Sequence, residues 1–296
     1  MNTPEAISLS ICIPVFNSDV RYLTQDLARQ CETLGAEWEI LLIDDASDEA
    51  YRTLNRDLAS LNGVRYIELP ENIGRSAIRN KLADESRYRY LLFMDCDAEI
   101  ASNYYLQKYS DVCKPGVVCY GGKINPAVCP DAKSCLRWKY SKRREEIGAN
   151  IRNQHPNRNF ITFNFIIDKN IFKIVRFDEN LNTYGHEDTL LGLDLQKNNI
   201  TVRHIDNPLM YAKFDSASVF VQKTEQGILN LIALQRKYPE LEDDVKLLRT
   251  AKRIRTLRLA PVIRALFCIS RTSLLKNLYG NKPSLCVLDF YKLGYL

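Results

Sequence analysis

Apolar blocks alternate with amphipathic blocks along the first third of the chain. Short apolar runs of the kind that form buried strands occupy residues 8–16, 38–45, 64–69 and 89–95. Between them, apolar residues recur with helical spacing at residues 20–35, 48–63 and 74–86. This alternation, with short connections, predicts an α/β fold in which a parallel sheet carries helices on both faces.

The second half of the chain is less regular, and it ends in a basic segment. Runs with strand character occupy residues 117–124, 160–167 and 201–206. Helical spacing is found at residues 134–148, 186–199 and 216–238. From residue 242 onward, eleven lysines and arginines outnumber four acidic residues, a net charge of +7 against +5 for the whole chain. We therefore expect a core domain over residues 1–240 and a basic helical extension over 241–296.

The basic extension allows two interpretations. Its apolar residues follow a helical period, so a helix can pack on the core domain with its basic side chains in water. The same helix can instead lie on an anionic membrane, where each basic residue near the surface contributes about 1 kcal/mol. Arg264 interrupts the longest apolar run, which favours peripheral attachment over insertion.

Composition narrows the class of protein. Hydrophobic residues make up 46% of the chain and charged residues 26%, as in soluble globular proteins. The nine cysteines show no CxxC spacing, which favours free thiols in a reducing compartment. We expect no signal peptide and no membrane-spanning helix, because no apolar run approaches roughly 20 residues. The sequence predicts a cytoplasmic protein without a nucleic-acid partner, and the extension leaves peripheral attachment to the inner face of the cell membrane open.

The sharpest chemical signal is a pair of aspartates at the end of a predicted strand. The run "LLFMDCDAEI" places Asp95 and Asp97 two residues apart, so in extended backbone both carboxylates point to one face. Adjacent carboxylates repel unless a cation lies beside them, and hard oxygen ligands suit Mg²⁺ or Mn²⁺ bound to a diphosphate. The alternative is that one of them caps the helix containing "NYYLQKY". The position at a strand end, where parallel sheets bind ligands, favours the metal.

Three further motifs supply candidate side chains, and each has a structural alternative. Asp45 in "LLIDDAS" ends a strand and can accept the N3–H of a uracil ring, or begin a helix. Arg75 and Arg79 in "ENIGRSAIRN" lie four residues apart and can reach a diphosphate, or form a solvated basic face. Glu187 and Asp188 in "YGHED" open a helix, where a carboxylate can act as a general base or complement the helix dipole.

In their order along the chain, these motifs resemble glycosyltransferase family 2, the inverting nucleotide-sugar transferases of the GT-A fold. The resemblance is carried by "SICIPVFN", "EILLIDDASDE", "ENIGRSAIRN", "YLLFMDCDAEI", "TFNFIID", "FDENLNTYGHEDTLLG" and "IDNPLMY". It implies a mixed, mainly parallel sheet flanked by helices, with the GT-A domain over residues 1–240. It also implies transfer of a sugar from a nucleotide-sugar donor, first of all a UDP-sugar, to a hydroxyl of a saccharide or lipid-linked acceptor in polysaccharide biosynthesis.

The resemblance implies roles for the residues at matching positions. The residues that hold the nucleotide base are Pro14, Val15, Phe16, Asn17 and Asp45, with Arg79 near the nucleotide. Asp95 approaches the ribose and a Mn²⁺ or Mg²⁺ ion, and Asp97 binds this ion under the diphosphate. Asp188 is the catalytic base, and Glu187 helps to place the acceptor.

One position departs from the family pattern. Relatives with "DNPxxH" carry a histidine where this chain has Tyr211, so His204 or water completes the metal site, or metal binding is weakened. A lone histidine in a strand such as that of His204 is more often structural. The departure leaves an alternative function, a catalytically impaired sugar-nucleotide-binding or scaffold protein of the same fold. A nucleotidyltransferase is disfavoured, because "IPVFNSDV" has neither a glycine-rich loop nor a lysine after the first strand.

Overall fold

The computed structural model describes residues 7–181 and 185–296, and these residues form two compact units. The sheet unit contains residues 7–124, 146–181 and 187–213. The helical unit contains residues 125–145, 185–186 and 214–296. The sequence predicts a boundary near residue 240 between a core domain and a basic extension, each taken as a segment that folds on its own. This boundary stays a prediction.

A seven-stranded sheet in the order β3-β2-β1-β4-β8-β6-β9 forms the centre of the sheet unit. Its strands are β1 (Ser8–Val15), β2 (Glu37–Asp44), β3 (Val64–Glu68), β4 (Tyr90–Met94), β6 (Val118–Tyr120), β8 (Asn164–Asp168) and β9 (Arg203–His204). β1 pairs in parallel with β2 and β4, β2 with β3, and β6 with β9. Among these seven described strands, β8 runs antiparallel to its neighbours, β4 and β6. The sheet is therefore mixed and mainly parallel, as predicted.

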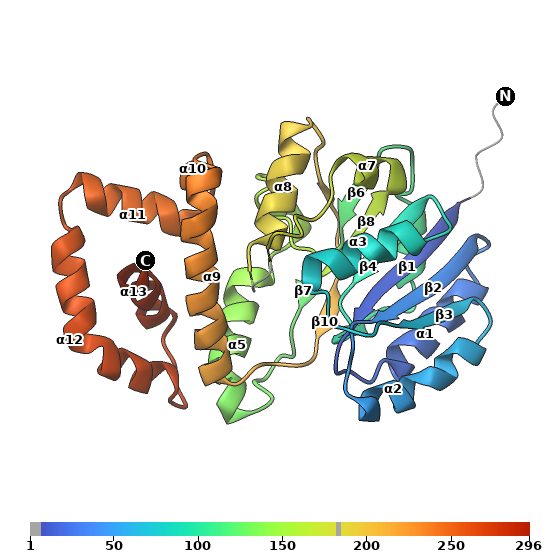
Figure 1. Cartoon of the computed structure of the whole chain (residues 1–296), viewed down its shortest axis with the longest axis horizontal. Coiled ribbons are helices and arrows are strands. Elements are labelled where there is room, and N and C mark those ends of the chain that lie inside the picture. Colours follow the sequence, from blue (N-terminus) through green and yellow to red (C-terminus); the bar gives the residue numbers. More distant parts are fainter. Residues whose placement is uncertain (1–6, 182–184) are drawn as a thin grey trace. The chain divides into compact units, whose positions relative to one another are not determined.

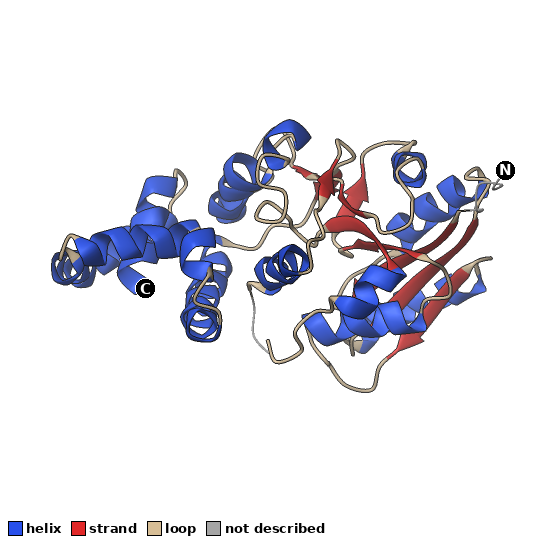
Figure 2. Ribbon diagram, turned by 90° about the horizontal axis from the view of Figure 1, so that it is seen from above, coloured by secondary structure: helices blue, strands red, loops and turns tan. Residues whose placement is uncertain are grey.

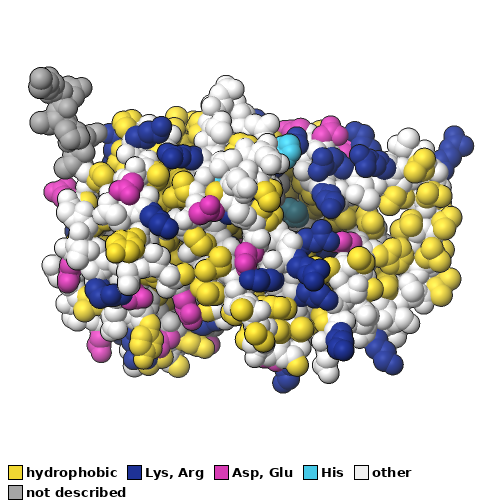
Figure 3. Space-filling model, turned by 180° about the vertical axis from the view of Figure 1, so that it is seen from behind, with side chains coloured by type: hydrophobic (Ala, Val, Ile, Leu, Met, Phe, Trp, Pro, Cys, Tyr) yellow, Lys and Arg dark blue, Asp and Glu magenta, His cyan; other side chains and the backbone are white. Residues whose placement is uncertain are grey.

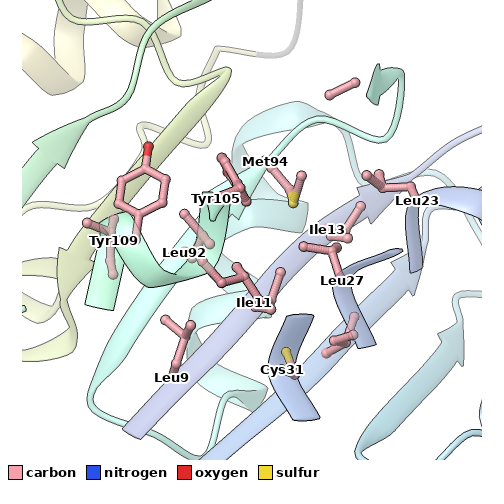
Figure 4. Packing of buried hydrophobic residues seen from close by; sticks show 14 of the residues in the cluster. Leu9, Ile11, Ile13, Leu23, Leu27, Cys31, Leu92, Met94, Tyr105 and Tyr109 are labelled. Carbon is pink, nitrogen blue, oxygen red and sulfur yellow. The ribbon is translucent and has the colours of Figure 1, made fainter. Parts of the chain in front are cut away.

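Helices cover both faces of this sheet (Figure 2). The helices of the unit are α1 (Arg21–Glu32), α2 (Glu49–Asn55), α3 (Arg75–Glu85), α4 (Tyr105–Ser110), α6 (Ala149–Arg152), α7 (Lys169–Ile174) and α8 (Glu187–Lys197). On one face, Leu9 and Ile11 of β1 lie in a hydrophobic cluster with Leu27 of α1 (Figure 4). On the other face, Cys12 lies in a second cluster with Ile78 of α3. Because β1 is buried on both faces, its sequence is a nearly continuous apolar run.

A second sheet has three strands that come from distant parts of the sequence, and the first of them follows β4 directly. Its strands are β5 (Ala98–Ile100), β10 (Leu209–Tyr211) and β7 (Lys123–Ile124), in the order β5-β10-β7. β5 begins immediately after Asp97, and the N-cap of the next helix, α4, is Tyr104. Asp95 and Asp97 therefore do not cap the "NYYLQKY" helix, which removes the structural alternative for this motif.

Several elements are shorter than the sequence predicts. The helix predicted at 48–63 is α2 followed by a 3₁₀ turn, Arg56–Ser60. The change falls after Asn55, whose buried side chain accepts from the N–H of Val20 and donates to the carbonyl of Ser18. The strand predicted at 201–206 is only the two residues of β9, which pair with the last two residues of the three-residue strand β6. Within 160–167, regular pairing begins at Asn164.

The helical unit has a hydrophobic core of its own. Its helices are α5 (Cys135–Tyr140), α9 (Ala217–Lys237), α10 (Leu241–Asp244), α11 (Lys246–Thr256), α12 (Ala260–Leu278) and α13 (Leu285–Tyr295), with a π-helical turn at Ser141–Glu145. Leu136 of α5 and Phe220 of α9 share one cluster with Phe267 of α12 and Tyr291 of α13. Figure 1 shows α13 beside α9 and α12, with which it is in contact. The basic extension thus supplies core side chains.

Helices of the extension pack closely, and none of them is suited to cross a bilayer. An added Cβ on Gly294 of α13 would lie 2.3 Å from the ring of Phe267, so glycine is needed where α12 and α13 meet. Within residues 7–181 and 185–296, no helix combines the length and the apolarity of a transmembrane segment.

Candidate functional site

The loops after β1, β2 and β4 lie at one edge of the large sheet. The three strands are parallel neighbours, and the last residues of β1 and β2 pair with each other. The predicted site residues at or directly after these strand ends are Pro14, Val15, Phe16, Asn17, Asp45, Asp95 and Asp97. They lie at the carboxyl edge of the sheet, where open α/β sheets bind their ligands.

Hydrogen bonds lock the loop after β1 to the loop after β2. The backbone N–H of Asn17 donates to Ser47 Oγ at 2.8 Å, and Asn17 Oδ1 accepts from the N–H of Asp48 at 2.7 Å. The φ of Asn17 is 46°, in the left-handed region that asparagine tolerates. The neighbouring ring of Phe16 is exposed. An exposed aromatic ring on a fixed loop is suited to contact a planar base.

Asp45 is buried and is tied to the segment that precedes α3. Its Oδ1 accepts from the N–H of Ile73 at 2.8 Å, and its Oδ2 accepts from the N–H of Gly74 at 3.1 Å. Burial raises the pKa of Asp45, and these two hydrogen bonds oppose the shift. Gly74 has a φ of 85°, so the turn that presents its N–H favours glycine. The Asp45 carboxylate is therefore fixed in place at the base-binding end of the predicted site.

Two arginines of α3 connect the aspartate motif with the "YGHED" motif. Arg79 Nη2 donates to Asp95 Oδ1 at 2.6 Å, and the Arg79 side chain is only 3% exposed. Arg75 Nη2 lies 3.9 Å from Asp95 Oδ2, and Arg75 Nε donates to Glu187 Oε1 at 2.8 Å. Because residues four apart lie on the same helix face, both guanidinium groups reach the same cluster of carboxylates. The alternative of a solvated basic face does not describe the buried Arg79, and the half-exposed Arg75 is ion-paired with Glu187.

Glu187 and Asp188, the first two residues of α8, have pKa values that are shifted in opposite directions. Burial alone would raise the pKa of Glu187, but the charges of Arg75 and Arg79 outweigh it and hold this pKa below its usual value. Burial raises the pKa of Asp188 to about 7, and the adjacent Glu187 adds to the rise. Thr162 Oγ1 donates to Asp188 Oδ1 at 2.6 Å and opposes that shift. A carboxyl group whose pKa lies near neutrality is suited to exchange a proton with a substrate.

Asp97 presents a buried oxygen without a protein partner. Within the described residues, Asp97 Oδ1 accepts no hydrogen bond. Burial raises the pKa of Asp97 to about 6, followed by the effect of Asp95, while the charges of Lys123 and Arg75 lower it. An orphaned carboxylate oxygen next to a second carboxylate fits a divalent cation, which would satisfy it. In this part of the chain no three His, Cys, Asp or Glu side chains form a complete metal site, so donor oxygens and water would have to complete the coordination.

Tyr211, the position that departs from the family pattern, lies next to this motif. It pairs with Ala98 in the small sheet, one residue after Asp97. Its ring faces the ammonium group of Lys123, whose Nζ lies 3.6 Å from the ring centroid. An aromatic ring in this position binds a cationic side chain, not a metal ion.

His204 lies among protein partners. Arg152 Nε donates to His204 Nδ1 at 3.2 Å, and His204 Nε2 lies 2.8 Å from the carbonyl oxygen of Pro156. Burial lowers the pKa of His204 to about 4, so the ring is neutral. Both ring nitrogens are occupied, which favours the structural role over the predicted metal ligation. His204 as a metal ligand stays a prediction without a supporting contact.

Two residues of this region do not stand out in the sequence. Thr162 is one of two polar residues in the mostly apolar run "FITFNF", and Lys123 follows two glycines in "YGGKI". The available signal is a polar side chain inside a strand-like run. An added Cβ on Gly121 would lie 2.4 Å from the carbonyl oxygen of Asn207, so a glycine before Lys123 is required by close packing.

Comparison with known proteins identifies the family. The model of glycosyl transferase family 2 matches residues 10–176, more than half of the chain. The chain belongs to glycosyl transferase family 2. The membership predicted from the motif order is thereby confirmed.

Curated proteins similar to this family 2 chain are much longer than the matched region. The chain is 25% identical over 183 residues to a teichoic acid poly(glycerol phosphate) polymerase of Staphylococcus epidermidis, covering 60% of this chain and 24% of that protein. It is 29% identical over 99 residues to a dodecaprenyl-phosphate galacturonate synthase of Rhizobium johnstonii, covering 32% of this chain and 29% of that protein. The chain thus spans less than a third of the length of these relatives.

Solved structures share the fold of this family 2 chain. A mannosyltransferase, PcManGT from Pyrobaculum calidifontis in complex with GDP-Man and Mn²⁺, superposes with a TM-score of 0.55 at 13% identity, covering 78% of this chain and 65% of that one. S. aureus TarS 1-349 in complex with UDP superposes with a TM-score of 0.51 at 17% identity, covering 98% and 89%. At these identities the likeness shows the fold alone, and the predicted GT-A fold is confirmed.

Proposed function

We propose that this chain is a metal-dependent, inverting glycosyltransferase that moves a sugar from a nucleotide-sugar, in the first place a UDP-sugar, to an acceptor hydroxyl. The observation that carries the proposal is the run of contacts from Asp95 through Arg75 to Glu187. These contacts join the donor motif to the predicted base motif, although the two are far apart in sequence. Family membership and the UDP bound in the structure of S. aureus TarS support this assignment.

The donor would lie along the carboxyl edge of the large sheet. Asp45 accepts an N–H of the base, and the Phe16 ring and Asn17 lie on the neighbouring fixed loop. Asp95 faces the ribose, and Arg79 holds this carboxylate in place through its 2.6 Å contact. A buried arginine–carboxylate pair that exists before the ligand binds reduces the ordering that binding requires.

Asp97 and Asp95 are the residues that would hold the Mn²⁺ or Mg²⁺ ion. Asp97 contributes the buried oxygen that has no protein partner in the described chain, and Asp95 contributes the neighbouring carboxylate. When bound, this ion stabilises negative charge on the leaving nucleoside diphosphate. The Mn²⁺ in the complex of PcManGT supports such an ion in a chain of this fold.

Asp188 would act as the general base. It removes the proton of the acceptor hydroxyl while that oxygen forms a bond to the anomeric carbon. The bond from this carbon to the diphosphate breaks at the same time, and its electron pair leaves with the nucleotide. Attack from the face opposite the leaving group inverts the anomeric configuration. Thr162 orients the Asp188 carboxylate, and Glu187, held by Arg75, lies beside it to place the acceptor.

The acceptor class that we propose is a saccharide or a lipid-linked saccharide. The names of the similar proteins, a teichoic acid polymerase and a dodecaprenyl-phosphate galacturonate synthase, support polymeric or lipid-linked acceptors. Such acceptors belong to polysaccharide biosynthesis.

The surface of α12 supports attachment to an anionic membrane. The exposed apolar row, as we call it, consists of Val262, Leu266 and Ile269 of α12 with Leu257 and Leu259 directly before this helix. Four of its residues recur at intervals of three and four, so they lie on one helix face, and Ile269 is 85% exposed. The exposed arginines close to this row in sequence are Arg253, Arg255, Arg258 and Arg264, of which Arg255 is ion-paired with Glu242. Figure 3 shows hydrophobic and basic side chains close together on this part of the surface. An apolar face bordered by arginines fits the headgroup region of anionic lipids.

The deciding experiment is incubation of the purified chain with a panel of sugar nucleotides, with hydrolysis or transfer recorded for each. Asp188→Asn is the matched variant, because it is nearly isosteric but cannot accept the proton. We expect turnover with one class of donor, and a fall of roughly 10²–10⁴-fold in Asp188→Asn with donor binding retained.

The panel also separates the proposal from its alternative. Nucleotide binding without turnover of any donor, in the presence of Mn²⁺ and candidate acceptors, would favour a sugar-nucleotide-binding or scaffold protein. Near-normal turnover by Asp188→Asn would remove Asp188 from the role of base.

A further inference from the structure

Lys123 is a buried cation close to the aspartate motif. The residue is 5% exposed. Its Nζ lies 3.6 Å from the centroid of the Tyr211 ring and 5.0 Å from that of Phe163. A buried ammonium group is unfavourable unless carboxylates or aromatic faces surround it. The two rings, which contact each other edge to face, therefore fix the position of this positive charge.

Backbone pairing brings this charge next to Asp97. Tyr211 of β10 pairs with Ala98 of β5, the residue after Asp97. The carbonyl oxygen of Phe163 accepts from the N–H of Asp95 at 3.2 Å. Both rings that hold the Lys123 ammonium are thus carried by segments bonded to the Asp95–Ala98 stretch. In keeping with this placement, the charge of Lys123 lowers the pKa of Asp97.

We propose that Lys123 is a built-in positive charge of the donor site, which helps to bind the diphosphate of the nucleotide and preserves part of the nucleotide affinity when no divalent ion is bound. The inference rests on the proposed function, and it adds a binding residue to that site. Its ligand class is a nucleoside diphosphate, because both rings that hold the Lys123 charge belong to segments bonded to the Asp95–Ala98 stretch, where the diphosphate is expected.

A fixed ammonium group has opposite effects on the binding of the diphosphate and on the binding of the metal ion. It attracts the anionic diphosphate and repels a divalent cation at the Asp97 carboxylate. Removal of the charge should therefore weaken nucleotide binding without metal and strengthen the binding of the metal. A lysine that served only packing would affect both affinities in the same direction, or neither.

Lys123→Met tests this difference, because methionine keeps the unbranched apolar stem and removes the charge. Calorimetric titration of UDP into the full chain is carried out in EDTA and in Mn²⁺. We expect Lys123→Met to lose about tenfold or more in UDP affinity in EDTA, equal to at least about 1.4 kcal/mol. The gain in UDP affinity on adding Mn²⁺ should be larger in this variant than in the native chain. Lys123→Arg, which keeps the charge, should retain UDP binding in EDTA.

Two control variants separate charge from packing. Lys169→Met removes a lysine whose Nζ donates to the carbonyl of Ser86, beside the amino end of β4 and away from the site. Its UDP affinity should equal that of the native chain in both conditions. Tyr211→Phe keeps the ring under the ammonium and should retain more UDP affinity in EDTA than Tyr211→Leu, which should weaken this binding as Lys123→Met does.

The outcomes distinguish this inference from the proposed function. Equal UDP affinities of Lys123→Met and the native chain in EDTA would overturn the role of Lys123, while the glycosyltransferase assignment would stand. A parallel loss in EDTA and in Mn²⁺, with no larger metal effect, would also overturn it in favour of packing. Failure of the native chain to bind any nucleoside diphosphate, with and without Mn²⁺, would overturn the proposed function and this inference together.

Discussion

At the scale of single residues, the environment of Asp188 sets the pH dependence of the proposed reaction. Burial and Glu187 raise its pKa to about 7, and a general base must be ionised to accept a proton. Transfer should therefore increase as the pH rises through about 7 and level off above it. The measurement is kcat/KM across pH 5 to 9, and a rate that is flat through this range would contradict the assignment.

The same shift has a consequence for stability. Because its pKa is raised in the folded state, the protonated form of Asp188 favours folding. Its contribution to the free energy of unfolding is complete below its pKa in the unfolded chain, near 4, and is lost as the pH rises through about 7. Asp188→Asn cannot ionise. It should unfold at a higher temperature than the native chain at pH 8, and this difference should vanish at low pH.

Thr162 provides a second test of the base. Its hydroxyl donates to Asp188 Oδ1 at 2.6 Å and stabilises the ionised carboxylate. Thr162→Val should move the rise of the pH–rate profile upward by roughly one to two pH units, as expected for loss of a hydrogen bond to a charged group. Thr162→Ser should restore the native profile. A uniform fall in rate without a shift along the pH axis would indicate a packing role instead.

Asp97 carries the prediction about the metal. Asp97→Asn keeps the shape of the side chain but replaces the orphaned, charged oxygen with an amide. We expect addition of Mn²⁺ to increase the UDP affinity of the native chain, and this increase should be smaller by about tenfold or more in Asp97→Asn. The variant should remain folded. The exposed Asp111, which accepts from Gln107, offers a control as Asp111→Asn. An unchanged effect of Mn²⁺ on UDP affinity in Asp97→Asn would remove Asp97 from the metal site.

At the scale of elements, the exposed apolar row on α12 predicts binding to anionic vesicles. Leu266→Glu and Ile269→Glu should each weaken vesicle co-sedimentation by tenfold or more, because burial of one such side chain contributes about 1.5–3 kcal/mol. High salt should weaken the native interaction, since the arginines beside the row contribute through charge. Ile174 of α7 is also exposed but lies outside this row, so Ile174→Glu is the matched control. If the native chain ignores anionic vesicles at low salt, the membrane proposal is wrong.

Elements with strong local signals were predicted well. The strands β1, β2 and β4 are buried on both faces, so their apolar runs are long enough to recognise. The carboxyl edge of the sheet follows from their parallel order, and therefore the grouping of Asp45 and Asp95 was also predictable. The role of Tyr211 as a partner of Lys123 depends on a three-strand pairing between distant segments, which no local pattern encodes.

Short elements and side-chain partners were harder to predict for the same reason. β9 has two residues and exists because β6 offers it an edge. Thr162 resembles any polar residue in an apolar run until the start of α8 places Asp188 against it. His204 was a candidate to replace the histidine missing at Tyr211, yet its partners, Arg152 and Pro156, come from a stretch whose sequence indicated no contact with it.

At the scale of the whole molecule, the extension after residue 240 is expected to be necessary for the helical unit. A chain ending at residue 240 would lack Phe267, Leu278, Leu288 and Tyr291, which pack with Leu136 and Phe220. We expect such a chain to expose the apolar side of α9 and to aggregate or bind hydrophobic dye. Retention of a soluble, cooperatively folded helical unit in this shortened chain would contradict the prediction.

A single substitution tests the same core without removing residues. Gly294→Ala would place a Cβ 2.3 Å from the Phe267 ring, and overpacking of this kind costs about 1–3 kcal/mol. Gly280→Ala is the matched control, because its added Cβ meets backbone oxygens only at 3.3 Å and 3.4 Å. Thermal unfolding should therefore show a clear loss of stability for Gly294→Ala and a smaller change for Gly280→Ala.

The division of the chain into interleaved segments also constrains the order in which it can fold during synthesis. Residues 125–145 leave the ribosome long before their partners in α9, α12 and α13 exist. Until then, Leu136 has no hydrophobic cluster to join, and it remains a site for chaperones or for mistaken association. The sheet unit, in turn, waits for residues up to 213, because β9 and β10 are its last strands. The nascent chain must therefore carry Leu136 without its hydrophobic partners through the completion of the first unit, so slower translation between residues 145 and 295 would prolong that exposure.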